Sequence, residues 1–250
     1  MVTESRKLAY KLLMLVGEGA YANIKLPQLL NDSGLSKQDR GFVQQLAYGT
    51  LRMQIQYDAL IAQVTEVDKL EPSVLNILRM GVHELLNMRT ETHAAVDQAV
   101  ELCKSETPKA SGLVNACMRK LSANAQQMLE KLTEDGDLGI EFAHPKWIID
   151  ALSASREMDG AGGVEALLEE NNNSPRPQMV ALPPSPLPDG AVELPLSKFG
   201  FESVDGLDLS NYRYQDQGSQ LVTQIAAKAA SGGNWLDMCA GPGGKASLLA

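Results

Sequence analysis

Apolar residues recur every three or four positions through almost all of the first 131 residues, and this spacing restricts the region to helices. The stretch SRKLAYKLLMLV, for example, places Leu8, Leu12 and Leu15 on one face of a helix. The pattern returns in several later segments that are separated by short polar turns, which gives five or more helices. We therefore predict a compact all-α domain over residues 1–135.

Residues that favour helix starts stand at the head of these segments. Ser36 can cap a helix, with Asp39 three positions later, and Pro72 stands in a first turn, where a missing N–H costs little. Thr92 and Pro108 begin two further segments. These start signals agree with the apolar spacing, and together they predict separate helices of ordinary length.

The composition changes after residue 135. Two more helical patches, HPKWIIDALSASREM and GVEALLEENNN, precede a segment, 174–195, that holds seven of the twelve prolines in the chain. Proline fixes φ and lacks the N–H that a sheet needs, so this segment is expected to be loop with edge strands. QMVAL and AVELPL are the best strand candidates. We treat residues 136–213 as a connector with a small α+β region.

Charge, apolar runs and cysteines narrow the class of protein. The net charge is −9, but residues 1–131 hold 15 Lys and Arg against 14 Asp and Glu, so a local basic face remains open there. No apolar run reaches the roughly 20 residues of a membrane span. Three widely spaced cysteines (Cys103, Cys117 and Cys239) form neither a CxxC pair nor a disulfide framework, which is typical of a reducing compartment. We predict a cytoplasmic monomer without a metal site.

The last residues combine an apolar run, a glycine cluster and the start of a helix, in WLDMCAGPGGKASLLA. Together with the preceding amphipathic stretch QDQGSQLVTQIAAKAA, this is the order of helix, buried strand, glycine turn and helix that opens an α/β sheet. Gly241, Gly243 and Gly244 permit positive φ and close backbone approach, and N–H groups at the next helix start favour a phosphate or an amino-acid carboxylate. The spacing matches neither a GxxxxGK[ST] loop nor a GxGxxG loop. A tight turn that binds nothing is the alternative.

Several blocks resemble the RNA cytosine-5 methyltransferases of the Sun/Nol/Nop group, in family order along nearly the whole chain. QDQGSQLV followed by LDMCAGPGGK is similar to the first cofactor motif, which reads close to LDLCAAPGGK, with Gly241 where alanine is usual. RGFVQQLAYGTLR, LRMGVHELL, HAAVDQAVELCK, GLVNACMRKL and HPKW resemble the NusB-like helical domain of the bacterial 16S ribosomal-RNA members. The resemblance implies a multidomain fold: a NusB-like all-α domain, the α+β connector, and over residues 214–250 an incomplete Rossmann-like methyltransferase domain.

The resemblance also implies an activity, the transfer of a methyl group from S-adenosylmethionine to C5 of a cytosine in ribosomal RNA of the small subunit. In this family a cysteine thiolate adds to the base, and the catalytic cysteines lie in later motifs. We therefore expect no catalytic residue in this chain and no turnover by these 250 residues alone. The implied cofactor contacts are Cys239, Ala240, Gly241, Pro242, Gly243, Gly244 and Lys245.

The other cysteines and the histidines have plainer interpretations. Cys103 and Cys117 occupy Leu-like positions in helical patterns, so we expect them in the core. His83, His93 and His144 are expected as caps, core partners or a chain corner, and not as metal ligands.

Four basic residues of the helical region are candidates for contacts with RNA phosphates, because they stand beside apolar stripes: Arg40, Arg52, Arg119 and Lys120. Ordinary solvated charge on helix surfaces is the alternative for them. A second function is also open, in which the helical domain works as a non-catalytic RNA- or protein-binding module of antitermination type.

Overall fold

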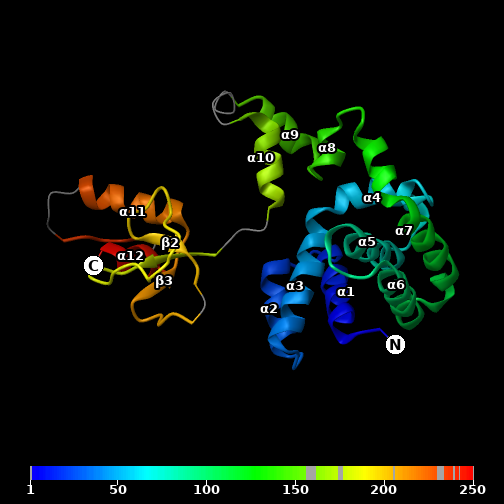
Figure 1. Cartoon of the computed structure of the whole chain (residues 1–250), viewed down its shortest axis with the longest axis horizontal. Coiled ribbons are helices and arrows are strands. Elements are labelled where there is room, and N and C mark those ends of the chain that lie inside the picture. Colours follow the sequence, from blue (N-terminus) through cyan, green and yellow to red (C-terminus); the bar gives the residue numbers. More distant parts are fainter. Residues whose placement is uncertain are drawn as a thin grey trace. The chain divides into compact units, whose positions relative to one another are not determined.

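The chain forms two compact units, residues 1–173 and residues 174–250. Figure 1 shows the first unit, from blue to yellow-green, as an assembly of helices, and the second, from yellow to red, as a small sheet with helices. The computed structural model describes residues 2–155, 162–173, 177–204, 206–229, 234–238, 240–241 and 243–249.

The first unit consists of helices and the turns between them, which confirms the predicted all-α N-terminal region. Short 3-10 turns η1 (Val67–Lys69) and η2 (Pro108–Ala110) precede two of the helices. The α-helices are α1 (Glu4–Gly17), α2 (Ala22–Asn31), α3 (Lys37–Arg52), α4 (Gln54–Ala62), α5 (Pro72–Asn87), α6 (Thr92–Glu106), α7 (Ser111–Thr133), α8 (Leu138–Glu141), α9 (Lys146–Ser153) and α10 (Gly163–Asn172).

The helix starts follow the local signals in the sequence. The Ser36 hydroxyl accepts a hydrogen bond from the backbone N–H of Asp39 at 3.1 Å and donates to its carboxylate at 2.7 Å, so this cap is confirmed. Pro72 is the first residue of α5, as predicted. The apolar stretch that begins at Ser36 is divided at Met53, where φ and ψ of −96° and 15° separate α3 from α4.

Helix α5 lies at the centre of the first unit and contacts α1, α3, α4, α6 and α7. Burial of each large apolar side chain contributes roughly 1.5–3 kcal/mol, so these contacts carry most of the stability of the unit. Cys103 and Cys117 are buried among them, which confirms their predicted place in the core. The largest side chains that are fully buried in this core are Tyr57, Leu12, Leu26, Leu46, Leu60, Ile61, Ile77, Leu78, Leu102, Met118 and Leu121.

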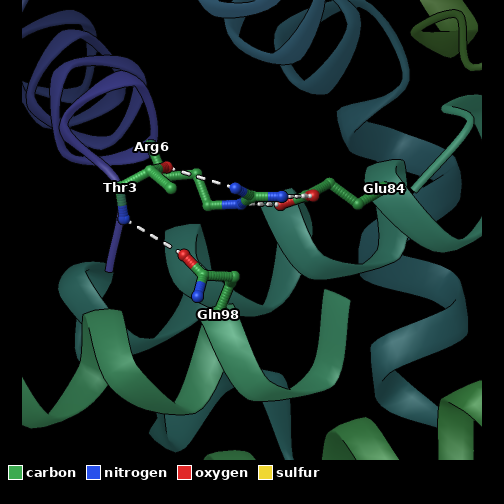
Figure 2. A network of polar contacts seen from close by, with 4 residues as sticks. All are labelled: Thr3, Arg6, Glu84 and Gln98. Atoms are coloured by element: carbon green, nitrogen blue, oxygen red, sulfur yellow. Dashed lines mark hydrogen bonds and ion pairs between the residues drawn. The ribbon is translucent and has the colours of Figure 1, made fainter. Parts of the chain in front are cut away.

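A polar network anchors the N-terminal helix to this core (Figure 2). The Arg6 guanidinium donates through Nε and Nη2 to the two carboxylate oxygens of Glu84 at 2.9 and 2.5 Å, and its Nη1 donates to the Thr3 hydroxyl at 3.1 Å. The Thr3 backbone N–H donates to Oε1 of Gln98 at 3.1 Å. The side chains of Arg6 and Glu84 are only 11% and 3% exposed, so this ion pair is buried and fixes α1 against α5.

A second buried polar cluster lies between α4 and α5. The Tyr57 hydroxyl lies 2.7 Å from Nδ1 of His83 and accepts a hydrogen bond from the side-chain amide of Asn87 at 2.8 Å. Burial lowers the pKa of His83 to about 4, so its ring is neutral at physiological pH. His83 is thus a core partner, as predicted.

Helices α8 to α10 belong to the helical unit. The Gln56 side-chain amide in α4 donates to the carbonyl oxygens of Ile140 and Glu141 at 3.1 and 3.0 Å, which holds α8. The Asn172 amide donates to the carbonyl of Phe142 at 2.8 Å, which ties the end of α10 to the same segment. Because of these contacts, the division between the units falls at residues 173 and 174, inside the region 136–213 that the sequence analysis treats as a connector.

The second unit contains a three-stranded antiparallel sheet in the order β2-β1-β3. Its strands are β1 (Gln178–Ala181), β2 (Gly200–Glu202) and β3 (Tyr212–Tyr214). Strand β1 confirms the QMVAL prediction, and Val180 pairs with Gly200 on one side and with Arg213 on the other.

The second strand candidate, AVELPL, is wrong as a strand. It makes only an isolated bridge between Glu193 and Phe201. Pro195 follows directly after Leu194 and has no N–H, so the pairing ends there. Strand β2 is an edge strand of the sheet, and Leu194 and Val192 exchange backbone hydrogen bonds with Gly200 and Glu202 on its other side, at 2.9 and 2.8 Å.

Within the described residues, no helix is long and apolar enough to cross a membrane.

Candidate functional site

The second unit holds a pocket of about 580 Å³ beside the glycine turn. The wall is formed by α11 (Gln217–Ala229), by residues 235–237 and by α12 (Gly244–Leu249). Most of the lining is apolar, and the exceptions include the carboxylate of Asp237 and the ammonium group of Lys245. The full lining is Val222, Thr223, Ala226, Trp235, Leu236, Asp237, Ala240, Lys245, Ala246 and Leu249.

Helix α11 is positioned by hydrogen bonds at its start. Oδ1 of Asp216 accepts from the backbone N–H groups of Gly218 and Ser219 at 2.8 and 3.4 Å, which caps the helix. The backbone N–H of Gln217 donates to Oε1 of Gln178 in β1 at 2.7 Å. The predicted amphipathic helix is confirmed, and these bonds fix its first turn against the sheet.

The glycine turn leads directly into α12. Gly243 has φ of +99°, a conformation that glycine adopts without strain, and its carbonyl accepts the backbone N–H of Ser247 at 2.8 Å. A Cβ at Gly241 would meet nothing within 4 Å, so the alanine that is usual in the resembling motif would fit there. The turn therefore has the conformation that the predicted glycine turn allows. Of Gly241 and Gly243, only Gly243 has a φ that favours glycine over other residues.

The predicted cofactor residues come together only in part. Ala240 and Lys245 line the pocket, while Gly241, Gly243 and Gly244 form the backbone between them. Cys239 and Pro242 lie outside the described residues. Helix α11 was not predicted to contribute, yet its Val222, Thr223 and Ala226 form one side of the pocket. The helical spacing of these three positions is a signal that could have indicated a shared face.

The expected buried strand before the turn is wrong for the described residues. Residues 234–237 have no strand pairing, and Trp235, Leu236 and Met238 are 48%, 84% and 87% exposed. A strand needs neighbours to satisfy its backbone groups, and the three-stranded sheet of this unit does not extend to these residues. The start of a Rossmann-like sheet is thus not formed here, although the helix and turn around it are.

Two of the four RNA candidates lie on α3 of the helical unit. Arg40 is half-buried, and its Nε donates to the carbonyl of Leu35 at 3.0 Å, so this side chain holds the segment before the helix. Arg52 is half-buried at the other end of α3. Burial is the largest cause of the low pKa of His83, and the charge of Arg52 lowers that pKa further. Both residues thus have a place in the fold besides any contact with RNA.

The other two candidates, Arg119 and Lys120, are exposed on α7. Arg119 lines a groove of about 590 Å³ between α6 and α7 together with the carboxylates of Glu91 and Asp97. This mixture of charges differs from the uniformly basic groove that a polyanion favours. Lys120 does not line this groove, and its charge acts against the burial that raises the pKa of the Cys117 thiol.

No group of three or more His, Cys, Asp or Glu side chains that could hold a metal ion occurs among the residues that the structure describes.

Comparisons with known proteins give matches along the chain. Residues 3–123 match the NusB family. A Mycobacterium tuberculosis protein (strain ATCC 25618 / H37Rv), named "Putative methyltransferase Rv1407", is 34% identical over 284 residues, which cover 98% of this chain and 60% of that protein. Ribosomal RNA small subunit methyltransferase B of Pseudomonas syringae pv. tomato is 30% identical over 268 residues, which cover 98% of this chain and 58% of that protein.

A solved structure shows the same fold. The crystal structure of PH0851 aligns with a TM-score of 0.60 at 14% identity and covers 100% of this chain and 61% of that chain. The chain thus spans about 60% of the length of the relatives that it matches. With the NusB family matched over residues 3–123 and these relatives matched along 98% of the chain, the chain is similar to part of the Sun/Nol/Nop-like proteins that carry a NusB domain and are named as methyltransferases.

Proposed function

We propose that the protein takes part in the transfer of a methyl group from S-adenosylmethionine to ribosomal RNA. The observation that carries the proposal is the similarity along 98% of the chain to a protein named ribosomal RNA small subunit methyltransferase B. The similarity includes the glycine turn and the helical unit, so it joins a cofactor motif to a candidate RNA-binding region in one chain.

The pocket beside the glycine turn fits the proposed methyl donor. Its volume of about 580 Å³ lies within the roughly 300–1,000 Å³ of small-molecule sites. Trp235 and Leu236 offer apolar surface for a nucleoside, and Gly243 and Gly244 contribute no side chains to the stretch between the lining residues Ala240 and Lys245. When bound, the donor supplies a methyl group on a positively charged sulfur. The residues of this chain would bind and orient it.

The finer part of the proposal concerns the target, C5 of a cytosine, and a cysteine nucleophile that lies outside this chain. Cys103 and Cys117 are poor nucleophiles, because both are buried in the helical core and burial raises the pKa of each thiol. Neither sulfur can reach an RNA base without unfolding of the core. We therefore propose that this chain contributes binding of the donor and of RNA, and that neither Cys103 nor Cys117 is the nucleophile.

A non-catalytic binding module is the second candidate function. It is favoured by one observation, the match of residues 3–123 to the NusB family, which covers the helical unit alone. In this case RNA or a protein partner would bind the helical unit, and the glycine turn would bind nothing.

Titration calorimetry of the whole chain with S-adenosylmethionine tests the first function against the second. We expect saturable binding by the unaltered chain and weaker binding after Gly243→Val, because a branched side chain is strained at a φ of +99°. The matched control is Gly241→Ala, which places a methyl group in open space and should leave the affinity unchanged. Absence of any binding, or equal binding by all three chains, would contradict a donor site at this turn.

Binding of the same chain to small-subunit ribosomal RNA across a salt series tests the RNA part. The slope of log affinity against log salt counts the phosphate contacts, at about 0.7 to 0.9 for each. We expect Lys120→Ala to reduce this slope by about one contact, while Lys37→Ala, which removes an exposed lysine at the start of α3, should leave it unchanged. Equal slopes for the unaltered chain and Lys120→Ala would remove Lys120 from the interface.

A further inference from the structure

Gln215 occupies a fixed position between the sheet and the start of α11. Its backbone N–H donates to the carbonyl of Gln178 at 3.0 Å, which continues the pairing of β3 with β1 by one residue. Its own carbonyl accepts a hydrogen bond from Nε2 of Gln220 at 2.8 Å. Both main-chain groups are therefore used, and the point from which the side chain departs is set by the fold.

The side-chain amide of Gln215 is buried and has no hydrogen-bond partner within the described part of the chain. The residue is only 9% exposed, and both Oε1 and Nε2 lack a partner among the residues that the structure describes. An amide has one acceptor and two donor hydrogens, and nearly all such groups are satisfied when buried in native proteins. A leucine of similar size would avoid the cost of leaving them unpaired, so the amide requires an explanation other than packing.

The amide lies against the glycine turn. A Cβ placed on Gly244 would lie 3.9 Å from both Cδ and Nε2 of Gln215, so the polar end of the side chain faces this backbone. Gly244 lies between Ala240 and Lys245, two residues that line the pocket. The amide thus lies beside the same short stretch of chain that carries these two pocket residues.

We propose that Gln215 recognises the amino-acid end of the methyl donor, an inference that rests on the proposed function of this pocket. An α-amino acid carries an ammonium group, which donates hydrogen bonds, next to a carboxylate, which accepts them. Oε1 of Gln215 can accept a hydrogen bond from the ammonium group, and Nε2 can donate one to the carboxylate. Both amide atoms are covered by protein, so the contact requires a rotation of the side chain or a shift of the turn, and Gly243 and Gly244 have no side chains to oppose that shift.

The test compares two thioether ligands that differ in the amino-acid end. S-adenosylhomocysteine has it, and 5′-methylthioadenosine lacks it. We expect Gln215→Leu to weaken calorimetric binding of S-adenosylmethionine and S-adenosylhomocysteine by roughly 10- to 100-fold, as expected for lost hydrogen bonds to charged groups, without changing the affinity for 5′-methylthioadenosine. The thermal midpoint should stay equal or rise. If Gln215→Leu folds poorly, Gln215→Met, which is unbranched, takes its place.

The matched control is Gln224→Leu, which also removes a glutamine amide but one that lies within α11 and donates to the Ser197 hydroxyl at 2.8 Å. This variant should bind all three ligands as the unaltered chain does. Equal affinities of the unaltered chain and Gln215→Leu for S-adenosylhomocysteine would overturn the inference while leaving the donor site in place. An equal loss for 5′-methylthioadenosine, or for Gln224→Leu, would overturn it as well. Failure of the unaltered chain to bind S-adenosylmethionine would instead refute the proposed function, and this inference with it.

Discussion

Gly49 in α3 is packed against His83 so closely that no side chain fits between them. A Cβ at this position would lie 2.2 Å from Cε1 and 2.3 Å from Nε2 of the His83 ring. The ring cannot move freely, because its Nδ1 lies 2.7 Å from the Tyr57 hydroxyl. We predict that Gly49→Ala destabilises the helical unit.

Two opposing effects set the magnitude of this change. Alanine favours an α-helix over glycine by about 1 kcal/mol, which would stabilise α3. Overpacking in a well-packed core costs about 1–3 kcal/mol, and a buried hydroxyl that loses its partner costs about 1–3 kcal/mol more. The packing effects are larger, so we expect a net loss of about 1–5 kcal/mol in the free energy of unfolding.

Urea unfolding followed by helical circular dichroism measures this loss. Gly41→Ala is the matched control, because Gly41 lies on the exposed face of the same helix and a Cβ there meets nothing within 4 Å. It should stabilise the chain by about 0.5–1 kcal/mol. In a His83→Ala background, Gly49→Ala should lose most of its cost. If Gly49→Ala is as stable as Gly41→Ala, the proposed close contact between α3 and α5 does not exist.

Three further outcomes are expected. Lowering the pH from 6.5 to 4 should reduce the free energy of unfolding by about 3 kcal/mol. The reason is that burial lowers the pKa of His83 to about 4, so the unfolded chain binds a proton that the folded chain does not. His83→Gln should remove this pH dependence, as measured by urea titrations at each pH. Arg6→Leu should lower the free energy of unfolding by about 3–5 kcal/mol, because it leaves the buried Glu84 carboxylate unpaired. The double variant Arg6→Leu with Glu84→Leu should lose less. Equal losses of the two variants in urea unfolding would argue against a buried pair. Gly243→Ala should lower the thermal midpoint, whereas Gly241→Ala should not, because only Gly243 has a positive φ.

The sequence predicts those parts of the fold that depend on neighbouring residues. Ser36 and Asp39 form their cap, and Pro72 opens a helix, because each effect acts within one turn of chain. Cys103 and Cys117 are buried because helical spacing decides which face they occupy. Local chemistry and apolar spacing thus suffice for most helices up to residue 131, but not for the break at Met53 or for the place of α8 to α10 in the helical unit.

Pairing over long distances could not be predicted in the same way. Gly200 and Arg213 belong to the sheet because each pairs with Val180. The three-residue strands that contain them are too short to show an alternation of apolar and polar residues. The apolar segment at Trp235 and Leu236 has a strand-like composition but finds no neighbouring strand in the described chain. Strand composition alone did not reveal whether a partner was present.

The candidate site was predictable only as far as residue type determines backbone geometry. The glycines indicated a close turn, and the positive φ of Gly243 is a conformation that favours glycine. The lining by α11 and the burial of the Gln215 amide depend on how α11 and the turn pack together. A glutamine next to a helix start has no sequence signal that separates it from an ordinary surface residue.

The anchoring of the first helix has a consequence for the order of folding during synthesis. Arg6 pairs with the carboxylate of Glu84, which lies 78 residues later in the chain, and Thr3 bonds to the side-chain amide of Gln98, 95 residues later. At 5–20 residues per second, a ribosome needs roughly 4–16 seconds to add those 78 residues. For that time the newly made N-terminal segment cannot dock, so its leucine-rich face is open to chaperones while the rest of the helical unit is translated.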